Sequence, residues 1–135
     1  MRPIIKKIQS SNIYNGKHAQ NQNVKIIVYN AEDGSKPFEK WFSSLNYSAT
    51  AKIVSAVDRM EQGNTSNIKW LGGGIGDYRI NWGPGYRIYL AQEGKELIIL
   101  FGGGTKKNQQ EDIQRAKKLY QEYKKQKKKT KKNQE

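Results

Sequence analysis

The chain has no cysteine and a single histidine, His18, among its 135 residues. Without cysteine there is neither a disulfide framework nor a thiolate metal site, and one histidine cannot assemble a zinc site. We therefore expect no metal and no cofactor. The absence of cysteine also fits a reducing cytosol, and we expect a cytoplasmic protein.

Long hydrophobic runs are missing as well. No segment approaches the roughly eighteen consecutive apolar residues of a membrane-spanning helix. The N-terminus carries Arg2, Lys6 and Lys7 without an apolar stretch, so we expect no secretory signal. The segment 115–125 comes nearest to a basic amphipathic helix but is short of apolar anchors, so we expect no membrane partner.

Negative charge is scarce, because 25 Lys and Arg stand against 12 Asp and Glu to give a net charge of +13. Residues 124–135 hold seven lysines and one glutamate, a charge of +6 that leaves +7 on residues 1–123. We predict that 124–135 is a disordered tail or a frayed helix end, since like charges repel. It either solvates the terminus or adds nonspecific affinity for an anionic polymer. The basic remainder, with its tryptophans and tyrosines, favours nucleic acid over a membrane surface.

Hydrophobic periodicity predicts one domain over residues 24–123, preceded by a polar, flexible extension at residues 1–23. Strands are expected at 25–29, 68–71, 77–82, 86–90 and 96–101, and helices at 37–45, 48–62 and 109–125. The order is β-α-α-β-β-β-β-α. We predict the α+β class, with an antiparallel sheet and its helices packed on one side. The segment 96–101 is almost wholly apolar, which is typical of a central strand covered on both faces.

A hairpin that turns at Gly83-Pro84-Gly85 places two arginines on one face of this sheet. Residues 77–82 and 86–90 alternate with period two, so Arg79 and Arg87 project from the polar face with Tyr89 beside them. Each guanidinium presents a planar fork of donors that suits a phosphate group. The alternative is an ordinary solvated face of an antiparallel sheet.

A series of short motifs occurs in a fixed order over about residues 24–125: Phe38-Glu39-Lys40-Trp41, 58–64, 71–75, Tyr78-Arg79-Ile80, 83–89, 103–106, Gln109-Gln110, and Asp112-Ile113 with Ala116. Together they resemble the RelE/ParE superfamily of toxins from type II toxin–antitoxin modules. The chain is most similar to the addiction-module killer proteins, the HigB-like and phage Gp49-like branch. Thr105 and Lys107 depart from that pattern, which usually has an acidic and a small polar residue there.

The resemblance implies a twisted antiparallel sheet with two N-terminal helices and a C-terminal helix. It also implies a toxin that is silenced by a cognate antitoxin, which we expect to be a small helix-turn-helix protein. Many members enter the ribosomal A site and cut mRNA, whereas the ParE-like branch poisons DNA gyrase without cleaving anything. We expect a ribosome-dependent, metal-independent mRNA endonuclease that inhibits translation. A gyrase poison, or a basic RNA-binding module that does not cut, is the alternative.

RNA cleavage without a metal needs a base for the 2′-hydroxyl, positive charge for the phosphate oxygens and an acid for the leaving oxygen. Because the expected domain has no histidine, a lysine or tyrosine must act with a pKa depressed by neighbouring cations. We assign Arg79 and Arg87 to transition-state charge, Lys106 to a phosphate contact or proton donation, and Tyr89 to base stacking or proton transfer. The alternatives are a solvated loop lysine at Lys106 and a cross-strand aromatic pair at Tyr89. Lys69, Lys107 and Tyr78 are the further predicted RNA contacts.

Overall fold

A computed structural model describes residues 23–134, with side chains as far as Thr130. Its elements, in chain order, are β1 (Lys25–Val28), α2 (Pro37–Ser43), α3 (Tyr47–Glu61), β2 (Lys69–Trp70), β3 (Gly76–Ile80), β4 (Tyr86–Glu93), β5 (Leu97–Gly104), the 3-10 turn η1 (Lys106–Asn108) and α4 (Gln109–Gln134). The order expected from the sequence is confirmed. Apart from Asn23, the predicted extension at residues 1–23 lies outside the described residues, and so does His18.

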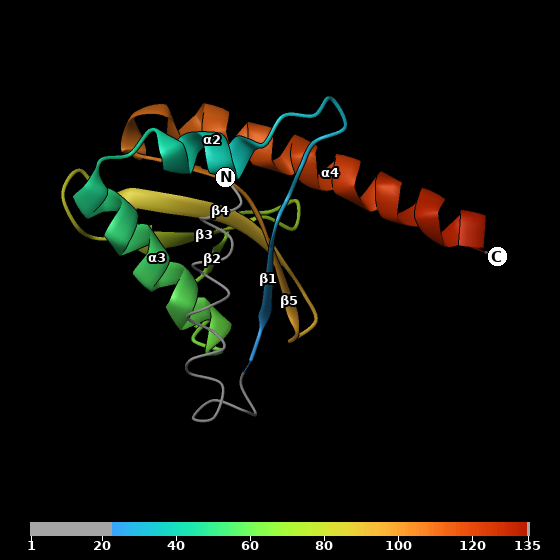
Figure 1. Ribbon diagram of the computed structural model, residues 1–135, viewed down its shortest axis with the longest axis horizontal. Helices are drawn as coiled ribbons and strands as arrows, with labels where there is room; N and C mark the ends of the chain where they lie inside the picture. Colours follow the sequence, from blue (N-terminus) through green and yellow to red (C-terminus); the bar gives the residue numbers. More distant parts are fainter. Residues whose placement is uncertain (1–22, 135) are drawn as a thin grey trace.

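The five strands form one sheet in the order β1-β5-β4-β3-β2 (Figure 1). All neighbours are antiparallel except β1 and β5, which run parallel. The predicted hairpin is confirmed between β3 and β4, where Arg79 lies opposite Arg87. Gly83 and Gly85 have φ angles of 59° and 83°. This left-handed conformation suits glycine, because it carries no Cβ to clash with the backbone.

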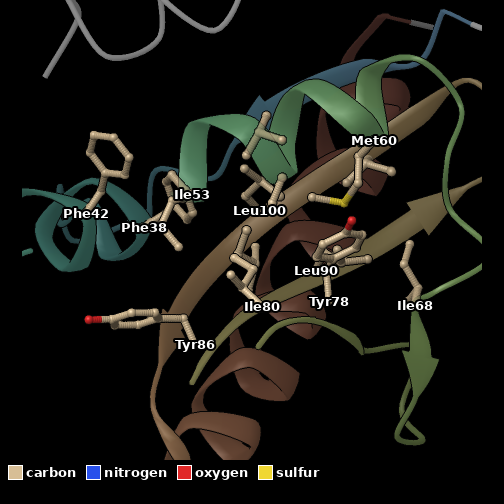
Figure 2. Close-up of a cluster of buried hydrophobic side chains, with 14 of the residues drawn as sticks. Phe38, Phe42, Ile53, Met60, Ile68, Tyr78, Ile80, Tyr86, Leu90 and Leu100 are labelled. Carbon is tan, nitrogen blue, oxygen red and sulfur yellow. The ribbon is translucent and has the colours of Figure 1, made fainter. Parts of the chain in front are cut away.

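One face of the sheet packs against α2 and α3. Figure 2 shows aliphatic and aromatic side chains from both helices meeting those of β3, β4 and β5. Ile53 of α3 and Phe38 of α2 are fully buried there. The side chain of Asn46 caps α3 by accepting a 2.8 Å hydrogen bond from the backbone N–H of Ala49. This cap begins the helix one residue before the expected Ser48, since it satisfies a free donor of the first turn.

The opposite face of the sheet is covered by α4, so the expectation that all helices pack on one side is wrong. A second buried cluster joins Ile99 and Phe101 of β5 to Ile113, Ala116 and Tyr120 of α4. The physical reason is in β5 itself, whose successive residues are all apolar and therefore present an apolar surface in both directions. Burying both surfaces requires a helix on each side.

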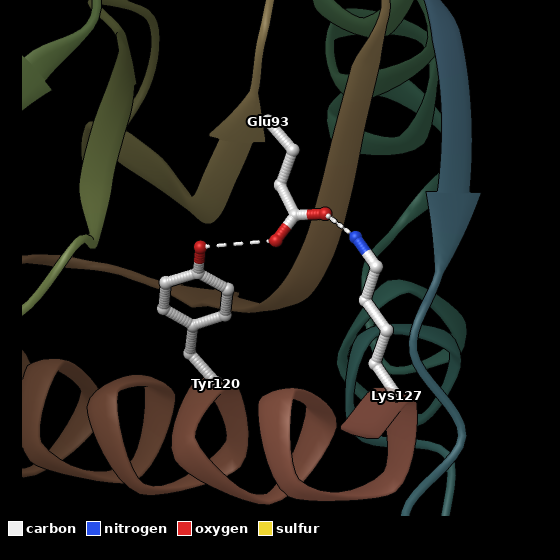
Figure 3. Close-up of polar contacts among 3 residues, drawn as sticks. All are labelled: Glu93, Tyr120 and Lys127. Atoms are coloured by element: carbon white, nitrogen blue, oxygen red, sulfur yellow. Dashed lines mark hydrogen bonds and ion pairs between the residues drawn. The ribbon is translucent and has the colours of Figure 1, made fainter. Parts of the chain in front are cut away.

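The helix α4 continues to Gln134, past its expected end at about Lys125, so the described part of the lysine-rich segment is helical, which favours a helix end over a disordered tail. Figure 1 shows its C-terminal half extending past the sheet. The beginning of the lysine run is tied to the body, because Lys127 Nζ lies 2.7 Å from Glu93 Oε1, and Tyr120 donates to Glu93 Oε2 at 3.3 Å (Figure 3). Lysine also has a good intrinsic helix propensity. Among the described helices, none is long and apolar enough to cross a membrane.

Candidate functional site

Strand register gathers the polar residues on the face that α4 covers. Asp77 pairs with Tyr89, and Arg79 pairs with Arg87, so these four side chains share one face. The short edge strand adds Lys69 to that face, because Lys69 lies opposite Asp77. The fold therefore brings together Arg79, Arg87 and Tyr89 as expected.

The centre of this arrangement is a buried carboxylate. Asp77 is fully buried, with Oδ1 3.5 Å from Arg79 Nε and Oδ2 3.6 Å from Arg87 Nε. The Arg79 side chain is 40% exposed, but that of Arg87 is only 13% exposed. The period-two alternation had suggested that Arg87 lies on an open face. Its side chain is instead largely buried, where it contacts Asp77. Because Asp77 contacts both guanidiniums, the two arginine side chains are ordered before any ligand binds.

A small groove of about 190 Å³ runs beside the two arginines. We call it the arginine groove; its lining residues are Arg79, Ile80, Asn81, Pro84, Gly85, Tyr86, Arg87 and Lys106. Lys106 reaches it because β5 ends at Gly104, next to the Arg87 end of β4. Lys107 is exposed on the same turn but does not line the groove. Three cations converging on one hollow are suited to bind a phosphate group.

Tyr89 lies beneath this groove rather than in it. It is 1% exposed, and among the described residues its hydroxyl has no hydrogen-bond partner. Burial first and the charge of Asp112 second raise the pKa of Tyr89 to about 12, although Arg87 and Arg79 act in the opposite direction. A phenol with a raised pKa is a poor base at neutral pH, and a buried ring cannot stack on a base from solution. Burial therefore contradicts the predicted base stacking by Tyr89, and the raised pKa argues against Tyr89 as the base in proton transfer.

Tyr78 is placed in the core, which corrects its assignment as an RNA contact. It is 4% exposed, and its hydroxyl accepts a 3.1 Å hydrogen bond from Arg59 Nε. Neighbouring residues of a strand point to opposite faces, so Tyr78 must face α3 when Arg79 faces the groove. Figure 2 shows it among the apolar side chains.

Two carboxylates were left without a role in the sequence assignment. Asp77 could have been found there, because it alternates with Arg79 on the same polar face. Asp112 comes from the first turn of α4, where its Oδ1 lies 3.3 Å from Arg115. Burial raises the pKa of Asp112 above its ordinary value. In the part of the chain that the structure describes, no three His, Cys, Asp or Glu are placed to hold a metal ion.

Comparison with known proteins identifies a relative. No protein-family model matches the sequence. A protein of Haemophilus influenzae, described only as uncharacterized, is 44% identical to this chain over 86 residues. The matched region makes up 63% of this chain and 87% of the Haemophilus protein.

Proposed function

The chain belongs to the same family as the Haemophilus influenzae protein, and we propose that it is the toxin of a type II toxin–antitoxin module. In this proposal it acts in the cytoplasm as an mRNA endonuclease on translating ribosomes. Its partner is a small helix-turn-helix antitoxin that keeps it silent. The element order supports the proposal, since a RelE/ParE-like toxin is expected to have this same arrangement of sheet and helices.

The observation that carries the proposal is the convergence of Arg79, Arg87 and Lys106 on the arginine groove. Attack of a 2′-hydroxyl on the adjacent phosphate concentrates negative charge on the phosphate oxygens. Cationic donors that are fixed beforehand stabilise that charge without having to reorganise. The buried Asp77 supplies this fixation through its contacts with both arginines.

Proton transfer in this groove falls to fewer groups than the sequence suggested. The raised pKa of Tyr89, about 12, removes the phenol as a base. In this proposal Lys106 donates a proton to the leaving 5′-oxygen, which its exposure and its position in the lining of the groove support. The proton of the attacking 2′-hydroxyl passes to solvent water as the bond from phosphorus to the 5′-oxygen breaks. Most of the rate enhancement then comes from charge stabilisation and from the positioning of the RNA.

A second function, RNA binding without cleavage, is favoured by one specific observation. Among the groove-lining residues there is no carboxylate or histidine, so no side chain of that kind is placed there to deprotonate a 2′-hydroxyl. A groove with cations alone binds phosphate but does not by itself start the reaction. The third alternative, poisoning of DNA gyrase, has no such observation in its favour.

The test is to induce the chain in cells and to map new RNA 5′ ends within minutes. An mRNA endonuclease gives discrete cuts inside translated reading frames, and these cuts disappear when translation is blocked. Translation that stops without new 5′ ends would replace the enzyme with the RNA-binding function. A DNA-damage response with linearised plasmid and intact mRNA would replace both with a gyrase poison.

A further inference from the structure

A second, larger hollow of about 820 Å³ lies between α2 and the beginning of α4. We call it the helix groove. Trp41 and Lys40 come from α2, Asp112 and Arg115 come from α4, and residues 102–104 of β5 form the floor. Its volume is in the range of pockets that hold small ligands of nucleotide size.

The glycines of the floor let two functional side chains approach the strand. A Cβ on Gly103 would lie 2.4 Å from the Trp41 ring, and a Cβ on Gly104 would lie 2.2 Å from Asp112 Oδ2. No other residue leaves room for both contacts. A Cβ at Gly102 would meet nothing within 4 Å, so the floor is open there. Since β1 pairs with β5 only from Leu97 to Leu100, no described strand covers the outer edge of residues 102–104.

The helix groove also contains a buried polar group with no described partner. The Tyr89 side chain lines this groove, and its hydroxyl makes no hydrogen bond to residues 23–130. A buried hydroxyl without a partner is costly, by about 1–3 kcal/mol.

The two grooves adjoin. Tyr86 lines both of them, and the chain passes from Thr105 in the helix groove to Lys106 in the arginine groove. A nucleotide whose phosphate lies between Arg79 and Arg87 is therefore positioned to place its base toward Trp41 and Asp112. This continuity makes one nucleotide the natural occupant of both hollows.

We propose that the helix groove is the nucleobase subsite of this chain and that Asp112 selects bases carrying an exocyclic amino group. The inference rests on the proposed function, because it takes the arginine groove as the place of the RNA phosphate. The Trp41 ring supplies an aromatic surface for the base. Lys36 and Lys40 line the same groove and bind the neighbouring phosphates, and Arg115 pairs with Asp112 Oδ1 at 3.3 Å.

The selectivity follows from the chemistry of the carboxylate. An ionised carboxyl group only accepts hydrogen bonds. Adenine, guanine and cytosine each present an amino group that donates, whereas uracil presents carbonyl oxygens on either side of its single imino donor. Uracil oxygens facing Asp112 are repelled, so the subsite disfavours uridine.

The experiment measures binding of the four nucleoside 3′-monophosphates to the full chain by calorimetry. We expect UMP to bind roughly ten times more weakly than AMP, GMP and CMP, because a good side-chain–base pair gives about 1–3 kcal/mol of discrimination. Asp112→Asn turns the pure acceptor into a group that both donates and accepts, and should bring the four affinities within about threefold. Glu111→Gln is the matched control, because it removes the adjacent exposed carboxylate of the same helix and should keep the discrimination against UMP.

A second measurement keeps the test decisive if Asp112→Asn folds poorly. In the unaltered protein, titration with AMP should shift the indole N–H signal of Trp41 and leave that of Trp70, on the far edge strand, unchanged. Equal affinity for all four nucleotides, or a shift at Trp70 alone, would overturn the subsite. Selective binding without mRNA cuts in cells would overturn the endonuclease function and leave the subsite standing. Cuts in cells without selective nucleotide binding would overturn the subsite and leave the endonuclease function standing.

Discussion

The sheet face under α2 and α3 and the sheet face under α4 are built from alternating residues of the same strands, yet they differ in one respect. The first is mostly apolar, from Ile80 to Leu100. The second is apolar only where the N-terminal half of α4 packs, around Ile99 and Phe101. Toward the hairpin turn it changes to Asp77, Arg79 and Arg87.

The difference shows which part of the sheet can carry polar functional residues. The face under α3 must exclude water completely, because it holds most of the buried apolar surface. The face under α4 needs to exclude water only along part of its length. Its other part carries the charges of Arg79 and Arg87, which Asp77 compensates inside the protein and which are still open to a ligand through the arginine groove.

The largest effect should come from the charged part of the second face. We expect Arg87→Ala to lower RNA cleavage by at least roughly a hundredfold, which is about 2.7 kcal/mol in the barrier, since one charge-stabilising contact is lost. Arg59→Ala is the matched control on the other face, where Arg59 binds Tyr78 and Ser55, and it should keep full activity. Primer extension on a translated mRNA gives both rates.

Arg87→Ala also leaves the buried Asp77 with one cation fewer, so some loss of stability is expected. The activity is therefore normalised to the folded fraction measured by circular dichroism. Arg87→Lys keeps the charge without the planar fork of donors. Its cleavage rate should lie between those of the unaltered protein and of Arg87→Ala. Full cleavage by correctly folded Arg87→Ala would remove the arginine groove from the mechanism.

A smaller effect is expected from Glu61, a buried carboxyl group of α3. Glu61 is 3% exposed, and burial raises its pKa to about 8. The native state holds this proton more tightly than the unfolded chain, so the free energy of unfolding should fall as pH rises from about 4.5 to about 8. We expect Glu61→Gln to raise stability at pH 8 by on the order of 1–3 kcal/mol and to flatten this dependence.

Urea denaturation at pH 5 and pH 8 measures the effect. Asp58→Asn is the companion variant, because the charge of Asp58 also raises the pKa of Glu61. It should flatten the dependence only slightly. A pH dependence that is unchanged in Glu61→Gln would show that this carboxyl is ionised without cost in the folded protein.

The smallest effect should come from the end of α4, beyond both faces. Truncation after Tyr123 removes the contact of Lys127 with Glu93 and that of Lys124 with the Tyr120 ring. Such exposed pairs contribute about 0–1 kcal/mol, so the melting temperature should hardly change. RNA affinity should weaken, and its dependence on salt should become shallower by a few units of slope at most.

Glu93→Gln in the full chain is the control for the truncation. It breaks the same ion pair but keeps every lysine, so it should leave the salt dependence of RNA binding unchanged. If the truncated chain unfolds, the end of α4 is part of the folded domain. If its affinity and slope are both unchanged, the lysine run makes no contribution to RNA binding.

The sequence by itself determined the elements and the identity of the cationic residues. Period-two alternation places Arg79 and Arg87 together on one face, and glycines flanking Pro84 specify the turn between them. These are local properties, because the preferences of neighbouring backbone units decide them. The same alternation was sufficient to put Tyr78 in the core, since it lies next to Arg79 in the strand.

Only the tertiary structure decided what these residues can do. The helix α4 packs on the face of the arginines, and its first turn brings Asp112 against Gly104. Burial raises the pKa of Tyr89, which was expected to transfer protons. Arg87 forms an ion pair with the buried Asp77. Burial and ion pairing depend on groups that are far apart in the chain, so no local pattern contains them. The same holds for the groove between α2 and α4, whose walls meet only when the sheet has its helices on both sides.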